Sequence, residues 1–168
     1  PPAVNPPAGT SPADKGLLLF DFEEDAQGWR VDWGDPVAGP ALTEEHAHHG
    51  KKSVAFTHEF GRNQEVVAGV ATLQSPKNLT GFRDLGAWVY LPSGHGWEIQ
   101  MYVRSGDDET VTWGKIQKGL KSGWHRAQID VRDIKEFTRV KDIGVQVKRF
   151  TWRGTATIYI DQVEAVAE

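Results

Sequence analysis

The 168-residue sequence contains no cysteine, only one methionine, and no apolar run approaching the ~20 residues that span a bilayer. The absence of cysteine excludes disulfides and thiolate metal sites. An excess of basic residues is also missing, since the formal net charge is −4. A chain of this charge has no electrostatic footprint for nucleic acid or for an anionic membrane. The composition therefore predicts a neutral partner, with neither nucleic acid nor membrane as the target.

The N-terminal stretch differs in composition from the rest of the chain. It reads PPAVNPPAGTSPADK and has almost nothing to bury, which predicts an extended, solvated linker over residues 1–16. No signal peptide is seen, so we expect a mature or excised fragment. The remaining length suits one folded domain over residues 17–168. Linkers of this kind join modules, so an attached catalytic domain in the parent chain is expected.

Short apolar or alternating segments separated by Gly- and Pro-rich turns predict an all-β fold. The segments SVAFTHEF, EVVAGVATLQS, GAWVYLP, DIGVQVKRF and TATIYIDQVEAV read as strands, and residues 35–40 read as a turn. Residues 97–130 read as three successive strands, and only VRDIKEFTRVKD could form a helical turn. The pattern predicts a two-sheet antiparallel β-sandwich of the jelly-roll kind with a concave ligand-binding face.

One predicted strand carries an unusual polar face. Within residues 97–104, Ile99, Met101 and Val103 alternate with long polar or aromatic side chains, which a strand points to its opposite face. Residues 143–148 repeat the pattern, and the strand before Asp130 adds two polar positions. The expected face comprises Glu98, Gln100, Tyr102, Arg104, Arg126, Gln128, Gln146 and Lys148. Aromatic platforms beside amides and guanidinium groups suit a hydroxyl-rich ligand; the alternative is a solvated sheet face without a ligand.

The seven tryptophans divide into two groups. Trp33, Trp113 and Trp152 lie beside Gly or Arg at turn-like positions, where exposure as a binding platform and packing in the core both remain open. The other four are expected to pack in the core or at its rim: Trp29, Trp88, Trp97 and Trp124.

Two isolated acids and a turn suggest a metal site. Glu23 ends the first predicted strand and Asp161 lies in the last, so they become neighbours if the terminal strands pair. The turn at residues 48–52 could add backbone carbonyls, and calcium prefers several oxygen ligands. The alternative is two surface carboxylates. His46, His48 and His49 lie in a polar loop without further ligands, which favours a solvated loop over a zinc site.

Catalytic signatures are missing from the sequence. Glycoside hydrolysis needs two carboxylates that face one groove, but only Glu98 lies on the expected face. Asp107, Asp108 and Glu109 form a turn cluster and not a spaced pair. No nucleophile elbow, H-E-x-x-H motif or phosphate loop is found. The sequence favours a non-enzyme.

Several short motifs together resemble the β-sandwich carbohydrate-binding modules of polysaccharide hydrolases. They are FDFEED, HHGKKSV, LGAWVYLP, the Gly-Trp pair at Trp124 and TIYIDQV, and the likeness covers about residues 17–166. The nearest resemblance is to families 27 and 11, which accompany mannanases and β-glucanases. It implies a secreted, monomeric, non-catalytic module that binds single β-1,4-linked chains, mannan or glucomannan first and β-glucan second.

The same resemblance implies a structural calcium ion near the chain termini. Glu23 and Asp161 would supply carboxylates, and the HHGKKS turn would supply carbonyls, Lys52 among them. Two other functions stay open: a galactose-binding-like domain whose polar face contacts a protein partner, and a small glycan-active enzyme.

Overall fold

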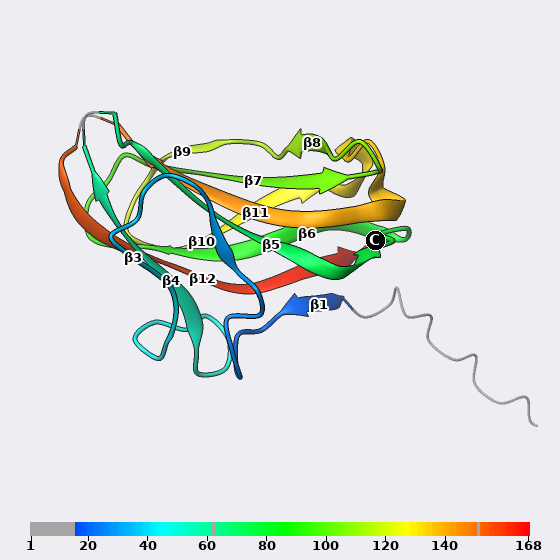
Figure 1. Cartoon of the computed structure of the whole chain (residues 1–168), viewed down its shortest axis with the longest axis horizontal. Coiled ribbons are helices and arrows are strands. Elements are labelled where there is room, and N and C mark those ends of the chain that lie inside the picture. The colour runs from blue at the N-terminus through cyan, green and yellow to red at the C-terminus, as the bar shows by residue number, and fades with distance from the viewer. Residues whose placement is uncertain (1–15, 62, 151) are drawn as a thin grey trace, which may run out of the picture.

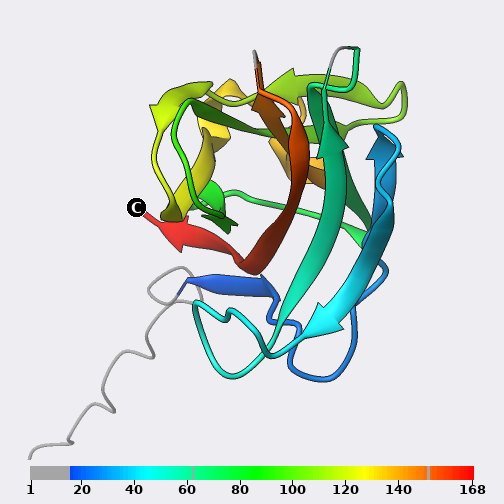
Figure 2. The same ribbon diagram turned by 90° about the vertical axis from the view of Figure 1, so that its left-hand side faces the viewer.

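The computed structural model describes residues 16–61, 63–150 and 152–168. It is a sandwich of two antiparallel six-stranded sheets (Figures 1 and 2). Sheet A has the order β10 (Gly123–Asp130), β6 (Phe82–Leu91), β12 (Gly154–Ala167), β4 (Ser53–Phe60) and β3 (Ala38–Thr43), with β1 (Leu17–Phe20) also paired to β12. Sheet B has the order β2 (Arg30–Trp33), β5 (Val66–Lys77), β11 (Val140–Arg149), β7 (Trp97–Ser105) and β8 (Thr110–Trp113), with β9 (Gln117–Leu120) also paired to β7. The predicted two-sheet β-sandwich is confirmed.

Strand alternation builds the core between the two sheets. From β7, Trp97, Ile99 and Met101 point inward and are buried, and Leu85 and Val89 of β6 meet them from the other sheet. Such alternation places every second side chain in one layer, which is the main source of stability in a sandwich. Sequence reasoning was correct for the inward row of β7, whereas both faces of β6 are apolar and alternation alone could not assign them.

Two 3-10 turns, η2 (Val131–Asp133) and η3 (Phe137–Arg139), connect β10 to β11. They occupy the stretch for which a helical turn was expected. The Asp130 side chain caps η2 by accepting a hydrogen bond of 2.9 Å from the Arg132 backbone N–H. Of the helices in the described ranges, none is long and apolar enough to cross a membrane.

The stretch Trp97–Asp130 was wrongly predicted to form three strands of one sheet. It contains four strands, and β10 crosses to sheet A, where it pairs with β6 along its whole length. Consequently Arg126 and Gln128 lie on the outer face of sheet A, on the far side of the sandwich from Gln100 and Tyr102. The predicted turn at residues 35–40 is also shorter, because β3 begins at Ala38.

The tryptophans expected to pack together take two different places. Trp29 and Trp97 are buried in the core, as predicted. Trp88 and Trp124 instead lie on the outer face of sheet A, where the His48 ring stacks on Trp88 at 3.9 Å and meets Trp124 edge-on at 5.3 Å. The loop between β3 and β4 therefore folds back over sheet A.

The folded part begins where the composition changes, since β1 starts at Leu17. Residues 1–15 lie outside the described residues, so the linker remains a prediction.

Candidate functional site

The outer face of sheet B carries the polar row that the sequence indicated. Strand register sets Gln100 directly opposite Gln146, Tyr102 opposite Gly144, and Arg104 opposite Asp142. Glu98 and Lys148 face each other at the end of the same row. The prediction that β11 extends the β7 face is confirmed by this pairing.

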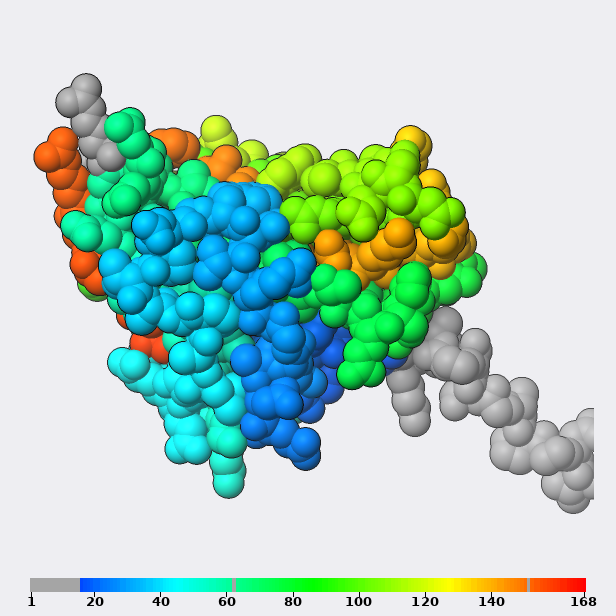
Figure 3. All heavy atoms as spheres, viewed as in Figure 1, coloured from blue at the N-terminus to red at the C-terminus, as the bar shows by residue number. Residues whose placement is uncertain are grey.

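Three aromatic rings from three strands gather in the middle of this face. The Trp33 and Tyr102 ring centroids are 4.8 Å apart, Tyr102 and Trp113 are 4.9 Å apart, and Trp33 and Trp113 are 5.7 Å apart. Tyr102 is fully buried, whereas Trp113 is 43% exposed and Trp33 is partly exposed. Tyr102 is thus the floor of the cluster, and the two tryptophans present their rings to solvent. The space-filling view shows the β2 segment in blue meeting the yellow-green β7–β8 region (Figure 3).

Tyr102 lies flat because its neighbour in the sheet has no side chain. An added Cβ on Gly144 would overlap the Tyr102 ring. The ring packs on Ala68 and Val70, and its hydroxyl donates a 2.6 Å hydrogen bond to Asp32 Oδ2. Burial and the Asp32 carboxylate raise the pKa of Tyr102, so its hydroxyl stays protonated as a donor. These contacts fix the floor on which Trp33 rests.

Gly144→Ala is expected to displace the Tyr102 ring and to destabilise the fold by about 2 kcal/mol, the usual cost of overpacking. The added methyl group overlaps aromatic atoms that are held from below by Ala68 and Val70. Urea unfolding measures the loss. The matched control is Gly61→Ala, where a Cβ meets nothing within 4 Å; equal stability of the two variants would contradict the role given to Gly144.

Arg104 forms ion pairs with two carboxylates beside the aromatic cluster. Its guanidinium donates to Asp32 Oδ2 at 2.5 Å and to Asp142 Oδ2 at 3.1 Å. Burial disfavours its charge, but the bonds to both carboxylates raise the pKa of Arg104 overall. Asp32 Oδ2 accepts hydrogen bonds from both the Arg104 guanidinium and the Tyr102 hydroxyl. Arg104 therefore holds the carboxylate that in turn fixes the Tyr102 ring.

Two amides form a fixed row beside the rings. Gln146 Nε2 donates to Gln100 Oε1 at 2.7 Å, and Gln100 Nε2 donates to the Gly114 carbonyl at 2.9 Å. Chained side-chain hydrogen bonds hold each amide in one orientation. Gln146 is buried and Gln100 is partly exposed, so Gln146 fixes the orientation of Gln100, the amide that faces solvent beside the aromatic cluster.

Hollows lie on both sides of the cluster. One, of about 470 Å³, is bordered by Arg30, Asp32, Arg104 and Asp142; the other, of about 390 Å³, is bordered by Trp33, Asp35, His58 and Val66. The face is thus longer than a single ring cluster and can accommodate an extended ligand.

Three predicted site residues lie elsewhere. The Arg126 guanidinium lies over Gly86 on sheet A, and its Nη2 pairs with Asp84 Oδ1 at 2.7 Å. Its Nη1 donates a 2.9 Å hydrogen bond to Gln128 Oε1. Trp152 lies at one end of the sandwich with its ring centroid 6.2 Å from that of Phe60. None of the three belongs to the face on sheet B.

Sequence reasoning missed Asp32 and Asp142. Asp142 lies two residues before Gly144 on β11 and on the same face as Gln146 and Lys148. The alternation of the sequence was therefore sufficient to predict it. Asp32 carried no such signal, because a register shift between Val31 and Trp33 brings adjacent residues of β2 to the same face.

The residues predicted to hold calcium form a hydrogen-bonded clasp with the β3–β4 loop. Asp161 is fully buried and accepts from the backbone N–H groups of His48 at 2.7 Å and His49 at 2.9 Å. Its other oxygen accepts from the Gln162 N–H at 2.6 Å. Burial raises the pKa of Asp161, and the N–H groups act against this.

Glu23 is held by the same loop. Its Oε1 accepts from the Lys51 and Lys52 N–H groups at 2.9 and 3.0 Å, which lowers the pKa of Glu23. The Lys52 ammonium donates to the Glu23 carbonyl at 3.0 Å. The loop thus donates hydrogen bonds to both carboxylates. The Lys52 ammonium also occupies the Glu23 backbone carbonyl, an oxygen that a calcium ion at this position would need.

This donor set does not fit a calcium ion, which takes 6–8 oxygen ligands. Within the described ranges, no three His, Cys, Asp or Glu side chains gather closely enough to hold a metal. Calcium bound by Glu23, Lys52 and Asp161 stays a prediction that this geometry does not favour.

Calcium removal is accordingly expected to leave the melting temperature unchanged within about 2 °C, because only a ligand bound to the folded state raises it. The measurement is a thermal melt in EDTA and in calcium chloride. A rise of several degrees with calcium, absent in Glu23→Gln, would restore the calcium site.

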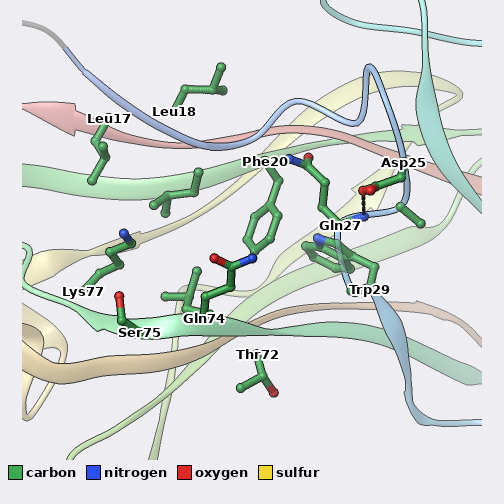
Figure 4. Close-up of a pocket in the computed structure, with 14 residues that line it drawn as sticks. Leu17, Leu18, Phe20, Asp25, Gln27, Trp29, Thr72, Gln74, Ser75 and Lys77 are labelled. Atoms are coloured by element: carbon green, nitrogen blue, oxygen red, sulfur yellow. Dashed lines mark hydrogen bonds between the residues drawn. The ribbon is translucent and has the colours of Figure 1, made fainter.

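Another hollow is separate from the aromatic face. It has a volume of about 810 Å³ and lies between β1 and β5, with Phe20 and Trp29 on its walls and Gln74 and Lys77 at its side (Figure 4). It opens at an edge of the sandwich where β1 belongs to sheet A and β5 to sheet B.

Comparison with known proteins yields a family match and several structural matches. Residues 20–162 match the family described as "Mannanase, galactose-binding domain-like". No curated protein sequence matches the chain. A solved structure of carbohydrate-binding modules "from the beta-sandwich super family" has a TM-score of 0.68 and 19% identity, covering 89% of this chain. The present chain spans only 61% of that one.

Two further structures are covered almost completely. CBM27-1 of Caldicellulosiruptor saccharolyticus, in complex with mannohexaose, has a TM-score of 0.71 and 13% identity over 92% of this chain and 98% of its own. The family 11 module of Clostridium thermocellum, in complex with a β-1,3-1,4-mixed-linked tetrasaccharide, has a TM-score of 0.63 and 9% identity over 90% and 95%. At such identities the matches establish a shared fold.

Proposed function

The chain belongs to the mannanase galactose-binding-like domain family, and we propose that it binds a single polysaccharide chain on the outer face of sheet B without catalysing a reaction. The proposed ligand is a β-1,4-linked mannan or glucomannan first, and a β-glucan second. In a secreted parent protein, such a monomeric module would hold an attached glycoside hydrolase near its substrate.

The observation that carries the proposal is the pair of exposed tryptophan rings beside oriented amides. Pyranose rings present apolar C–H faces that stack on aromatic rings, and equatorial hydroxyls that bond to amides. Trp33 and Trp113 supply the stacking surface, and the partly exposed Gln100, held in place by Gln146, supplies the amide. The two flanking hollows extend the face for neighbouring sugar units.

The charges on this face favour a neutral ligand. Arg104 is paired with Asp32 and Asp142, and Glu98 faces Lys148. These groups carry one more negative than positive charge, so they give no attraction for a polyanion. Binding should therefore change little between low and high salt, because screening acts on charge–charge attraction.

The same ion pairs support a non-catalytic role. A glycosidase needs one carboxyl group as acid and a second as base or nucleophile on the two sides of the scissile bond. Asp32 and Asp142 are both engaged by one guanidinium, and Asp32 also receives the Tyr102 hydroxyl. Their contacts suit a structural role beneath the rings.

The preference for mannan has its support in the comparisons. The matching family is named for mannanases, and the structure of CBM27-1 holds mannohexaose. Mixed-linked glucan in the family 11 module is the reason for ranking β-glucan second.

Isothermal titration against mannohexaose, cellohexaose and xylohexaose tests the proposal. We expect measurable heat with mannohexaose, weaker heat with cellohexaose, and one site per chain. Absence of heat with all three would overturn it. Two further assays separate the remaining classes. In affinity gels with soluble polysaccharides, unretarded migration favours a protein-interaction domain. A reducing-sugar assay on the same polysaccharides reveals an enzyme.

A further inference from the structure

Another polar pocket lies apart from the aromatic face and shares none of its residues. Its volume is about 340 Å³, within the range of small-ligand sites. Its base is the outer face of sheet A, and its walls come from the β3–β4 loop, the β6–β7 loop and the β11–β12 connection. The residues that matter for its chemistry are Glu45, Tyr90, Ser93, Arg149, Trp152, Thr155 and Tyr159.

Arg149 is the unusual member of this pocket. It is only 6% exposed, and its guanidinium carbon lies 4.4 Å from the Trp97 ring centroid and 4.0 Å from that of Trp152. No hydrogen bond or ion pair joins this guanidinium to another residue of the described ranges. The two indole rings favour the cation but accept none of its N–H donors.

Other enclosed arginines in this protein do have carboxylate partners. Arg104 pairs with Asp32 and Asp142, and Arg126 pairs with Asp84. A largely buried guanidinium that pairs with no carboxylate depends on water or a ligand for its hydrogen bonds. Burial lowers the pKa of Arg149. Among the described residues no carboxylate, Glu45 included, forms an ion pair with this guanidinium.

The remaining groups of the pocket suit a sugar. Ser93 of the β6–β7 loop and Thr155 of β12 are exposed residues that line the pocket with their hydroxyl-bearing side chains. The Tyr90 ring is held by His46 at 4.0 Å. Glu45 is engaged by Tyr159, whose pKa is raised to about 12 by burial and by this carboxylate. The pocket thus combines an unneutralised fork of N–H donors with hydroxyls and aromatic rings.

We propose that this pocket binds one acidic sugar residue, a uronate, whose carboxylate accepts hydrogen bonds from Arg149 while its hydroxyls meet Ser93 and Thr155. A planar guanidinium matches a carboxylate with two parallel bonds. Arg149 ends β11 of sheet B, but the other lining residues come from sheet A and its loops, and none of them belongs to the proposed mannan face, so each site can bind without the other.

The test uses the Trp33→Ala/Trp113→Ala variant of the whole chain, in which the face on sheet B is silenced. Glucuronate and galacturonate are titrated and compared with glucose and galactose, with the Trp152 indole N–H followed by NMR. We expect one uronate per chain, affinity at least about tenfold above that of the neutral sugar, and weakening with salt.

Arg149→Met keeps the packing between the two indole rings but removes the donors, and should lower uronate affinity at least about tenfold. Arg153→Met is the control, because Arg153 is exposed on the same connection, and should leave it unchanged. If Arg149→Met does not fold, Arg149→Lys, which lacks the planar fork, replaces it and should weaken binding.

Three results would overturn the proposal: no shift of the Trp152 signal with either uronate, equal affinity for uronate and neutral sugar, or uronate binding unaffected by the Arg149 variants. If inorganic phosphate bound and neither uronate did, the pocket would be a site for a simple anion and the uronate proposal would be wrong. Because mannohexaose is not used, failure here leaves the function proposed for sheet B unaffected.

Discussion

Trp113→Ala is expected to weaken mannohexaose binding about 30-fold, which corresponds to about 2 kcal/mol, the scale of an aromatic hot spot. Trp113 is the most exposed ring of the cluster at 43%, and it lies beside Trp33 at 5.7 Å and above the buried Tyr102. Its removal takes away a stacking platform and uncovers part of Tyr102, whose ring still packs on Ala68 and Val70. Isothermal titration measures the affinity, and circular dichroism confirms that the sheet is retained.

Trp124→Ala provides the matched control. It removes an equally large ring from the outer face of sheet A, where Trp124 meets His48 and Tyr90. Mannohexaose affinity should stay within about twofold of the starting protein, since the mutated ring is on the opposite sheet. Equal losses in the two variants, or no loss in Trp113→Ala, would show that the ligand does not lie on the aromatic face.

The central row of this face was predictable because it depends on local alternation. Gln100, Tyr102 and Arg104 occur at every second position of one strand, and a strand fixes their common side regardless of what surrounds it. Gln146 follows by the same logic on β11. Tyr102 was nevertheless expected to act as a platform, whereas it is fully buried; covering by Trp33 and Trp113 is a property of tertiary structure.

Sheet membership was not predictable, because it depends on non-local pairing. Arg126 and Gln128 alternate on β10 as regularly as Gln100 and Tyr102 do on β7, but β10 pairs with β6 and not with a strand of sheet B. A short connection is compatible with either a hairpin or a crossing between sheets. Periodicity therefore identified the polar positions of β7, β10 and β11, but the prediction of one common face was wrong because those of β10 are on the other sheet.

The faces of β6 were ambiguous for a related reason. Val89 points to the core and Trp88 points away from it, yet both are apolar. The outer face is apolar because the β3–β4 loop folds onto it, with His46 on Tyr90 and His48 on Trp88. The sequence predicted that these histidines lie in a solvated loop. Instead, His46 and His48 pack on the aromatic rings of the outer face of sheet A.

Asp161→Ala is expected to lower the free energy of unfolding by about 3 kcal/mol, since it leaves three backbone N–H groups without their carboxylate acceptor. Those groups belong to His48, His49 and Gln162. For a domain of this size the melting temperature should fall by about 10 °C. The loss arises because Asp161 joins the last strand to the loop that covers sheet A.

Asp161→Asn separates hydrogen bonding from charge. Its amide oxygen can still accept from the His48 and His49 N–H groups, but its NH2 group faces the Gln162 N–H. Burial raises the pKa of Asp161, so removing the charge also relieves a desolvation cost. Asn should therefore cost about 1 kcal/mol, well below Ala. Asp35→Ala, at an exposed position, should change stability by less than about 0.5 kcal/mol. If Asn and Ala were equally damaging, the carboxylate charge and not the hydrogen bonds would hold the clasp, and a bound cation would again be the better explanation.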